Sequence, residues 1–325
     1  MEPVPPRLLV ALRERAEVAA GVAVVLPAVP WAYLAQATSE GRAQAEALLV
    51  GAFEREFPEF DPATLPRLAF VQRIYTGLDG FPFARFPPAV KVAGNVGAFA
   101  PAVAEHAVAL ALAAARQVVA AQPMVAEGRL RPAPEQRTLV GTSALILGYG
   151  EIGREIARRL SGFGVRVTGL NRTGRMGAGC DAMFPADRLG EALEGADLVF
   201  DARPLTRITR GSIGAAELAR MRSRAIYVNV GRAATVDEQA LYEHLVQHPD
   251  FRAAMDPWWR EHFGTATFET PFAFWKLPNF VGSPHAAGNV PGAEDRALRM
   301  ALENLARYFR GEPPRYVVDR SEYLG

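Results

Sequence analysis

The chain has 325 residues, and its 36 lysines and arginines against 35 aspartates and glutamates give a formal net charge of +1. At roughly 100–200 residues per domain this length predicts two domains, and a hydrophobic fraction of 50% excludes a disordered chain. The near-neutral charge argues against nucleic acid as the main partner. The single cysteine, Cys180, allows no internal disulfide, and no Cys/His pattern predicts a metal site.

Short apolar runs alternate with polar or helical stretches in the first part of the chain. Residues 18–38 carry no charge, but Pro27 and Pro30 would break a membrane-spanning helix. The residues before this stretch mix both signs of charge, unlike a signal peptide. We therefore expect a buried strand at Val22–Leu26, no membrane partner and a cytoplasmic protein. Further strands of a small α/β unit are expected at Ala47–Val50, Leu68–Gln72 and Val90–Ala93.

The second part of the chain begins with an alanine-rich stretch, Pro101–Ala121, whose apolar spacing predicts one long helix. A connector rich in Pro, Gly and Arg follows at residues 128–137. After it we expect strands at Thr142–Leu147, Val165–Leu170, Asp197–Asp201, Ala225–Val230 and Ala253–Met255, and helices at Ile152–Phe163, Leu189–Leu193, Ala215–Met221 and Glu238–Gln247. This alternation predicts right-handed βαβ units in a parallel sheet. A helix at Glu294–Phe309 and a return strand at Arg315–Asp319 would complete the chain.

A glycine motif follows the strand that ends at Leu147 and opens the next helix. Its six residues form the pattern GxGxxG: Gly148, Tyr149, Gly150, Glu151, Ile152 and Gly153. The first glycine permits a tight turn, the second lets a pyrophosphate approach the backbone, and the third lets helix and strand pack closely. Backbone amides at the helix start would face the phosphates. The alternative is an ordinary glycine turn, but the strand before and the helix after favour a dinucleotide site.

The loop after the next strand bears on the choice of cofactor. Enzymes that use NAD usually carry an acidic residue about 20 residues beyond the motif, where it binds the ribose 2′-hydroxyl. Here Asn171 stands 18 residues after Gly153, accompanied by Arg172, Thr173 and Arg175. Arginine can pair with a 2′-phosphate that a carboxylate would repel. The loop favours NADP(H), with NAD(H) possible if the arginines are merely solvated.

Three later segments complete an ordered set of motifs: residues 202–209 (ARPLTRIT), residues 228–238 (VNVGRAATVDE), and Asp256–Glu261 (DPWWRE) with Ser283–His285 (SPH). Together with the glycine motif they resemble the D-isomer-specific 2-hydroxyacid dehydrogenase family, in the style of glyoxylate and hydroxypyruvate reductases. The resemblance runs from about Arg73 to Gly311. With the expected elements it implies an α/β protein of two Rossmann-like domains with parallel sheets, an active site in the interdomain cleft, and a homodimer. The dinucleotide-binding domain would span 99–287, and a discontinuous substrate domain 1–98 and 288–325.

By position in these motifs, the resemblance implies Arg232 as the substrate anchor, His285 as the acid/base, and Glu261 as the partner of His285. Imidazole suits protonation of a carbonyl near neutral pH, and a neighbouring carboxylate favours imidazolium. A guanidinium offers two directed donors to a carboxylate. Because His262 stands where the family usually has proline, Glu269 stays open as the alternative partner.

Other family positions concern the substrate and the cofactor. The backbone amides of Thr76, Gly77 and Leu78 would hold the substrate carboxylate, with Asn95 lining the same cleft; a plain glycine turn is the alternative. Asp256 matches the position that contacts the nicotinamide carboxamide. Further cofactor contacts are expected from Arg203, Pro204, Thr209 and Val230.

These inferences predict an oxidoreductase that transfers a hydride between NAD(P)H, preferably NADPH, and a 2-oxo acid to give a D-2-hydroxy acid. Two alternatives stay open: a catalytically idle dinucleotide-sensing protein of the same fold, and a relative that acts on a different substrate, such as formate or phosphite. Ser-Pro-His fits the hydroxyacid type better than the formate type, whose histidine follows a glutamine. Five aromatic residues would select the substrate if they line the pocket, although core packing is commoner for such residues: Trp258, Trp259, Phe268, Phe272 and Trp275.

Overall fold

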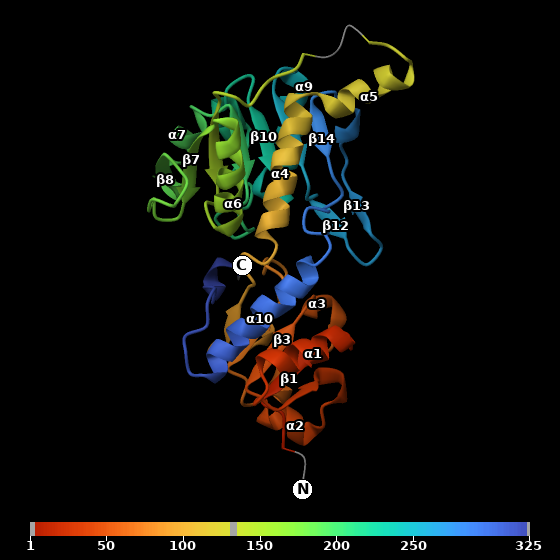
Figure 1. Cartoon of the computed structure of the whole chain (residues 1–325), viewed down its shortest axis with the longest axis vertical. Coiled ribbons are helices and arrows are strands. Elements are labelled where there is room, and N and C mark those ends of the chain that lie inside the picture. The colour runs from red at the N-terminus through yellow and green to blue at the C-terminus, as the bar shows by residue number, and fades with distance from the viewer. Residues whose placement is uncertain (1–3, 131–134, 324–325) are drawn as a thin grey trace. The chain divides into compact units, whose positions relative to one another are not determined.

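The computed structural model describes residues 4–130 and 135–323. The chain divides into two compact units (Figure 1): residues 1–99 with 291–325, and residues 100–290. The limits expected from the sequence, after residues 98 and 287, lie one and three residues earlier than these. Each unit is built on a parallel sheet with helices on its faces.

The first unit contains a five-stranded parallel sheet in the order β2-β1-β3-β4-β5. The strands are β1 (Leu8–Ala11), β2 (Trp31–Tyr33), β3 (Ala47–Val50), β4 (Phe70–Arg73) and β5 (Lys91–Ala93). Strands β1, β3 and β4 are buried at every position, as expected for strands covered on both faces. Helices α1 (Ala16–Val25) and α10 (Ala293–Phe309) pack on one face. Helix α3 (Phe53–Glu56) and a cluster of phenylalanines cover the other, and the short α2 (Ser39–Gln44) precedes β3.

Two expectations for this unit are wrong. Residues Val22–Val25 belong to helix α1, not to a strand, and the helix ends before Pro27. The uniformly apolar run gave no periodicity to separate the two states, whereas the buried Val18 and Val22 lie four residues apart, as on one helix face. Segment Arg315–Asp319 forms no strand and contributes an isolated antiparallel bridge between Ala93 and Val317.

The second unit contains a seven-stranded parallel sheet in the order β14-β11-β10-β9-β6-β7-β8. The strands are β6 (Ser143–Leu147), β7 (Arg166–Asn171), β8 (Ala182–Pro185), β9 (Leu198–Asp201), β10 (Ile226–Asn229), β11 (Arg252–Met255) and β14 (Phe280–Gly282). Counted in chain order, this is the doubly wound arrangement 3-2-1-4-5-6 with one further strand. The order reverses between β6 and β9, where the glycine motif leaves the sheet. The predicted α/β class with parallel sheets is confirmed.

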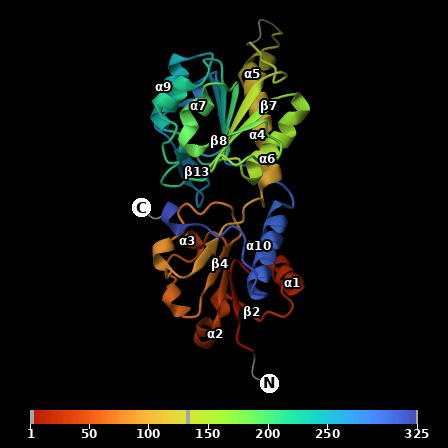
Figure 2. The same cartoon turned by 90° about the vertical axis from the view of Figure 1, so that its left-hand side faces the viewer.

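Helices cover both faces of this sheet. They are α4 (Ala100–Ala115), α5 (Val118–Ala126), α6 (Glu151–Leu160), α7 (Leu189–Leu193), α8 (Ala215–Arg220) and α9 (Glu238–Gln247). Figure 2 shows α7 and α9 on one face and α4 and α6 on the other. The single helix expected over Pro101–Ala121 is divided, because Gln117 adopts a left-handed conformation (φ 52°) between α4 and α5. Residues 131–134 of the expected connector lie outside the described residues.

The second unit also contains a hairpin that was not expected from the sequence. Strands β12 (Arg260–His262) and β13 (Thr267–Glu269) form an antiparallel hairpin between β11 and β14 in the chain. Among the described helices, none alone is long and apolar enough to cross a membrane. Helices α4 and α5 meet that test of length and composition only as a pair, bent by 58°.

Candidate active site

The glycine motif forms the turn from β6 into α6. Gly148 has a φ of 84°, which strains other residues, and a Cβ there would lie 3.0 Å from the backbone nitrogen of Arg203. A Cβ at Gly153 would lie 2.9 Å from the carbonyl oxygen of Gly148, so the helix start packs directly on the turn. No protein atom lies within 4 Å of a Cβ built on Gly150. The backbone is therefore open where a pyrophosphate is expected, beside first-turn amides that have no partner within the helix.

The other side chains of the motif are directed elsewhere. Tyr149 is buried, and its hydroxyl donates to the carbonyl oxygen of Ala178 at 2.8 Å. Glu151 pairs with Arg154 one turn along α6. For these residues, and for the half-buried Ile152, the backbone is the part that can serve a dinucleotide.

The loop after β7 is held by Asn171. Its Oδ1 accepts hydrogen bonds from the amides of Thr173 (3.0 Å) and Gly174 (2.8 Å), and its Nδ2 donates to the carbonyl oxygen of Arg175 (2.9 Å). The side chains of Arg172, Thr173 and Arg175 are exposed. Asn171 thus shapes the turn at residues 171–175, which presents two arginines and no carboxylate and fits a 2′-phosphate.

The side chain of Arg203, which was expected to contact the cofactor, is bound by other residues of the protein. Its guanidinium is buried and donates to both oxygens of Asp201, at 2.9 and 2.6 Å, and to Ser212 Oγ at 2.9 Å. The side chain therefore supports the loop after β9. Farther along this loop, Thr209 Oγ1 donates to the carbonyl oxygen of Pro204 at 2.6 Å. Val230, expected beside the cofactor, is 7% exposed.

Arg232 follows the carboxyl end of β10, and its backbone is fixed by buried polar side chains. Its carbonyl oxygen accepts from Asn229 Nδ2 at 3.1 Å and from Thr235 Oγ1 at 2.8 Å. Thr235 Oγ1 also lies 2.9 Å from Asp201 Oδ2, which ties this loop to the carboxylate that holds Arg203. Asn229, Thr235 and Asp201 were not predicted as site residues. A signal was available for Asp201 and Asn229, since they end β9 and β10, where sheet ligands bind.

His285 and Glu261 are in direct contact: Nδ1 of the imidazole lies 2.6 Å from Oε1 of the carboxylate. The same Oε1 accepts the amide of Trp258 at 2.9 Å. Glu269, the alternative partner, forms an ion pair with His262 instead, with 3.2 Å between Nε2 and Oε1. The bond at Nδ1 leaves Nε2 of His285 as the ring nitrogen able to exchange a proton with a ligand.

Asp256 holds the turn that carries His285. Its carbonyl oxygen accepts the amide of His285 at 2.9 Å, and its carboxylate accepts the amides of Ala286 (2.9 Å) and Ala287 (3.1 Å). These hydrogen bonds hold His285 in a left-handed conformation (φ 53°), which is uncommon for a residue with a side chain. Asp256 was expected to contact the nicotinamide carboxamide. Its hydrogen bonds run to the turn that carries His285.

Asp256 is 2% exposed, and its carboxylate also contacts His106 and Ser283. Ser283 Oγ donates to it at 2.6 Å and contacts His106 Nε2 at 2.8 Å. Burial opposes ionisation, but the hydrogen bonds from His106, Ser283 and the two amides outweigh it and lower the pKa of Asp256 to about 2. Asp256 is therefore a permanent anion at neutral pH. His106 and Ser283 were missed as supports because they lie far from Asp256 in the chain.

In the first unit, the loop expected to bind the substrate carboxylate is tightly packed. A Cβ at Gly94 would lie 2.7 Å from the carbonyl oxygen of Thr76, and Thr76 Oγ1 donates to the carbonyl oxygen of Asn95 at 3.1 Å. Asn95 is 3% exposed, and its Nδ2 donates to the carbonyl oxygens of Ile74 (2.9 Å) and Ala297 (2.7 Å). Asn95 is thus a structural link between this loop and α10.

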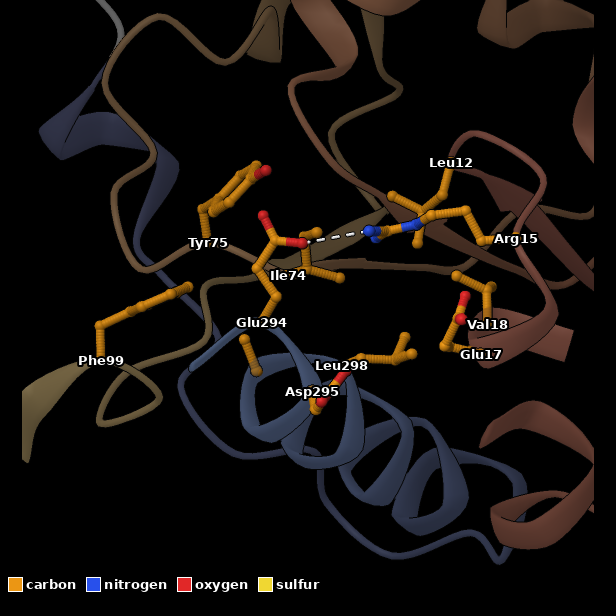
Figure 3. Close-up of a pocket in the computed structure, with 11 residues that line it drawn as sticks. Leu12, Arg15, Glu17, Val18, Ile74, Tyr75, Phe99, Glu294, Asp295 and Leu298 are labelled. Atoms are coloured by element: carbon orange, nitrogen blue, oxygen red, sulfur yellow. Dashed lines mark hydrogen bonds and ion pairs between the residues drawn. The ribbon is translucent and has the colours of Figure 1, made fainter. Parts of the chain in front are cut away.

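The rest of this loop leaves only backbone for a ligand, because the side chain of Leu78 is buried in the core and Gly77 has none. Tyr75, at the start of the loop, borders a cavity of about 410 Å³ (Figure 3). Arg15 and Glu294 form an ion pair of 3.1 Å at this cavity. The other charged lining residues are acidic, Glu17 and Asp295, so its charge does not suit a carboxylate substrate.

A metal site was not expected, and among residues 4–130 and 135–323 no group of three or more His, Cys, Asp or Glu side chains is placed to hold a metal ion. The arrangement offers a dinucleotide turn, an imidazole–carboxylate pair and an arginine at the ends of parallel strands. It is suited to proton transfer beside a bound dinucleotide.

Comparison with known proteins gives one family. The family model for the NAD-binding domain of D-isomer specific 2-hydroxyacid dehydrogenases matches residues 108–287. A glyoxylate reductase of Korarchaeum cryptofilum is 32% identical over 261 residues, which cover 78% of this chain and 77% of the relative.

Two solved structures agree over nearly the whole chain. One is a protein of Pyrobaculum aerophilum that is provisionally assigned as a formate dehydrogenase. Its sequence is 31% identical and its TM-score is 0.82, and the match covers 98% of this chain and 100% of that one. The other is the NADPH-dependent glyoxylate/hydroxypyruvate reductase of Sinorhizobium meliloti in complex with NADP and sulfate: 25% identical, TM-score 0.79, covering 98% and 99%. The resemblance inferred from the sequence is confirmed, and the chain belongs to the D-isomer specific 2-hydroxyacid dehydrogenase family.

Proposed function

We propose that this protein reduces 2-oxo acids of the glyoxylate and hydroxypyruvate type to D-2-hydroxy acids with NADPH. The observation that carries the proposal is the 2.6 Å pair of His285 and Glu261 on a turn fixed by Asp256. Gly148, Arg232 and His285 follow β6, β10 and β14, whose carboxyl ends meet at one edge of a parallel sheet. That edge is where doubly wound sheets bind their ligands.

Each residue then has a defined task. A reduced nicotinamide, when bound, supplies the hydride. His285 donates a proton from Nε2 to the carbonyl oxygen of the substrate, and the Glu261 carboxylate stabilises the imidazolium before that transfer. Arg232 binds the substrate carboxylate through its guanidinium, while Asn229 and Thr235 keep its backbone in place. The amides of Thr76, Gly77 and Leu78 remain our proposal for further carboxylate contacts.

The preference for NADPH rests on the loop that Asn171 shapes. It exposes Arg172 and Arg175 with no acid among residues 171–175, and a relative that is NADPH-dependent shares the fold. Substituting Arg172→Ala would raise the Michaelis constant for NADPH by about 10- to 150-fold, equivalent to the loss of a charged hydrogen bond worth about 1.5–3 kcal/mol, with little change for NADH. Arg166→Ala, at the other end of β7, is the matched control. Equal effects on both cofactors would show that Arg172 does not meet the 2′-phosphate.

The activity itself is tested with NADPH and NADH against glyoxylate, hydroxypyruvate, pyruvate and phenylpyruvate, following loss of the reduced cofactor. We expect turnover that His285→Ala abolishes while dinucleotide binding persists. Binding without any turnover would support the alternative of a dinucleotide-sensing protein. Oxidation of formate by the protein with NADP⁺ or NAD⁺ would favour the assignment attached to the Pyrobaculum structure. We also expect a cytoplasmic homodimer, and light scattering on the purified protein measures the oligomeric state.

A further inference from the structure

The hairpin β12–β13 is a firmly anchored element. Trp258, just before it, stacks on Phe268 of β13 with ring centroids 4.0 Å apart and planes inclined by 14°. Trp258 is 7% exposed, and its Nε1 donates to the carbonyl oxygen of Ser283 at 2.9 Å. Arg260 of β12 donates to the carboxylate of Glu238 in α9 at 2.8 and 3.0 Å. These contacts hold the hairpin against the turn that carries His285.

The hairpin places a phenylalanine against the catalytic imidazole. The ring of Phe263, the first residue after β12, meets His285 edge to face, with centroids 5.3 Å apart and planes inclined by 65°. Phe263 is nevertheless 55% exposed. Phe263 lies two residues after Glu261 in the chain, and both side chains contact His285. The mechanism above uses Glu261 and gives no task to Phe263.

We infer that Phe263 is a specificity-determining residue that favours 2-oxo acids with an apolar or aromatic group on the carbonyl carbon. The inference rests on the proposed function, because a carbonyl oxygen bonded to Nε2 of His285 brings that group close to the neighbours of the imidazole. Covering an exposed phenylalanine ring with an apolar group removes apolar surface from water. Glyoxylate carries only hydrogen at this position and gains nothing from the ring.

The charged groups of the hairpin do not favour a second charge on the substrate. Arg260 is bound to Glu238, and His262 is bound to Glu269. In the register of the hairpin, Arg260 lies opposite Glu269, whereas Glu261 lies opposite Phe268. The face that carries Glu261 is therefore otherwise aromatic, which matches an apolar substituent.

The test compares phenylpyruvate and 4-methyl-2-oxopentanoate with glyoxylate. In Phe263→Ala, kcat/KM for the two larger acids is expected to fall at least about tenfold, and for glyoxylate less than about threefold. Phe263→Leu should recover most of the loss for 4-methyl-2-oxopentanoate. Val246→Ala, which shortens an exposed apolar side chain on α9, is the control and should change no ratio between substrates.

A second measurement does not depend on turnover. Calorimetric titration of the NADPH-loaded full-length protein with phenyllactate and glycolate, a combination that cannot react, should show that Phe263→Ala weakens the binding of phenyllactate alone by about tenfold. An equal loss for every ligand, or no loss for any, would overturn the role in specificity. A wild-type protein that reduces no 2-oxo acid would refute the proposed function, and the titration would still decide whether Phe263 selects the ligand.

Discussion

The contact between Glu261 and His285 gives the sharpest prediction. Both hydrogen bonds to Glu261, from His285 and from the amide of Trp258, end on the same oxygen. In Glu261→Gln, the amide oxygen can accept both bonds, so the geometry is kept and only the charge is lost. In Glu261→Ala both bonds are lost, and the amide of Trp258 is left without its acceptor.

The expected magnitudes follow from these contacts. A hydrogen bond to a charged group contributes about 1.5–3 kcal/mol and a neutral one about 0.5–1.5 kcal/mol, so the glutamine variant loses about 1–1.5 kcal/mol. Since about 1.4 kcal/mol is a factor of ten in rate, kcat/KM for a 2-oxo acid should fall about tenfold. In Glu261→Ala, kcat/KM should fall about a hundredfold. Both variants should bind the dinucleotide as the wild type does.

The assay is the steady-state rate with NADPH and the best 2-oxo acid, on variants whose thermal unfolding confirms an intact fold. Glu269→Gln is the matched control, because this second glutamate of the hairpin pairs with His262. If kcat/KM fell as much in Glu269→Gln as in Glu261→Gln, the assignment of Glu261 as the partner of His285 would be refuted. So would a Glu261→Gln enzyme that keeps more than about half of the wild-type rate.

Three further predictions concern the cofactor site and stability. Gly150→Ala should weaken dinucleotide binding at least about tenfold in a fluorescence titration without lowering Tm, because its Cβ meets no protein atom within 4 Å. The pKa of Asp256 is near 2 in the folded protein, so its charge stabilises the fold above the pKa of the unfolded chain, and this stabilisation decreases as the pH falls. In urea titrations, the difference in unfolding free energy between the wild type and Asp256→Asn should shrink by about 1 kcal/mol from pH 6 to pH 3. Burial, and after it the charge of His248, lowers the pKa of His244 to about 4. The unfolding free energy of the wild type should therefore fall by about 1–2 kcal/mol from pH 7 to pH 5, and His244→Gln should remove that fall. An equal pH dependence of the two unfolding free energies would contradict this prediction.

Much of the second unit could be predicted from the sequence, because strands and helices alternate there and the sequence marks the boundaries between them. The glycine motif, for example, stands between a buried strand and an amphipathic helix. The first unit was harder. The run Val22–Leu26 is apolar throughout, so its composition fits a strand and a helix equally, and only packing against α10 decides between them.

The choice between Glu261 and Glu269 could not be made from the sequence because it depends on the register of an antiparallel hairpin. A shift of one residue would turn the other set of side chains toward His285. The task of Asp256 was hidden for a related reason. Its partners in the turn lie 27–31 residues away in the chain, and their amides carry no sequence signature.

The hairpin also has a consequence for how this enzyme could change. Glu261 belongs to β12, whereas Phe263 begins the connection to β13, which runs through Gly264 and Thr265 to Ala266. Insertions or deletions in that connection alter what stands beside the imidazole, yet they leave the residue that pairs with Nδ1 in register. If Phe263 and Glu261 have the roles that we propose, substrate range and proton transfer are encoded by adjacent but separable stretches of one hairpin. A library confined to residues 263–266 could retune the first while preserving the second.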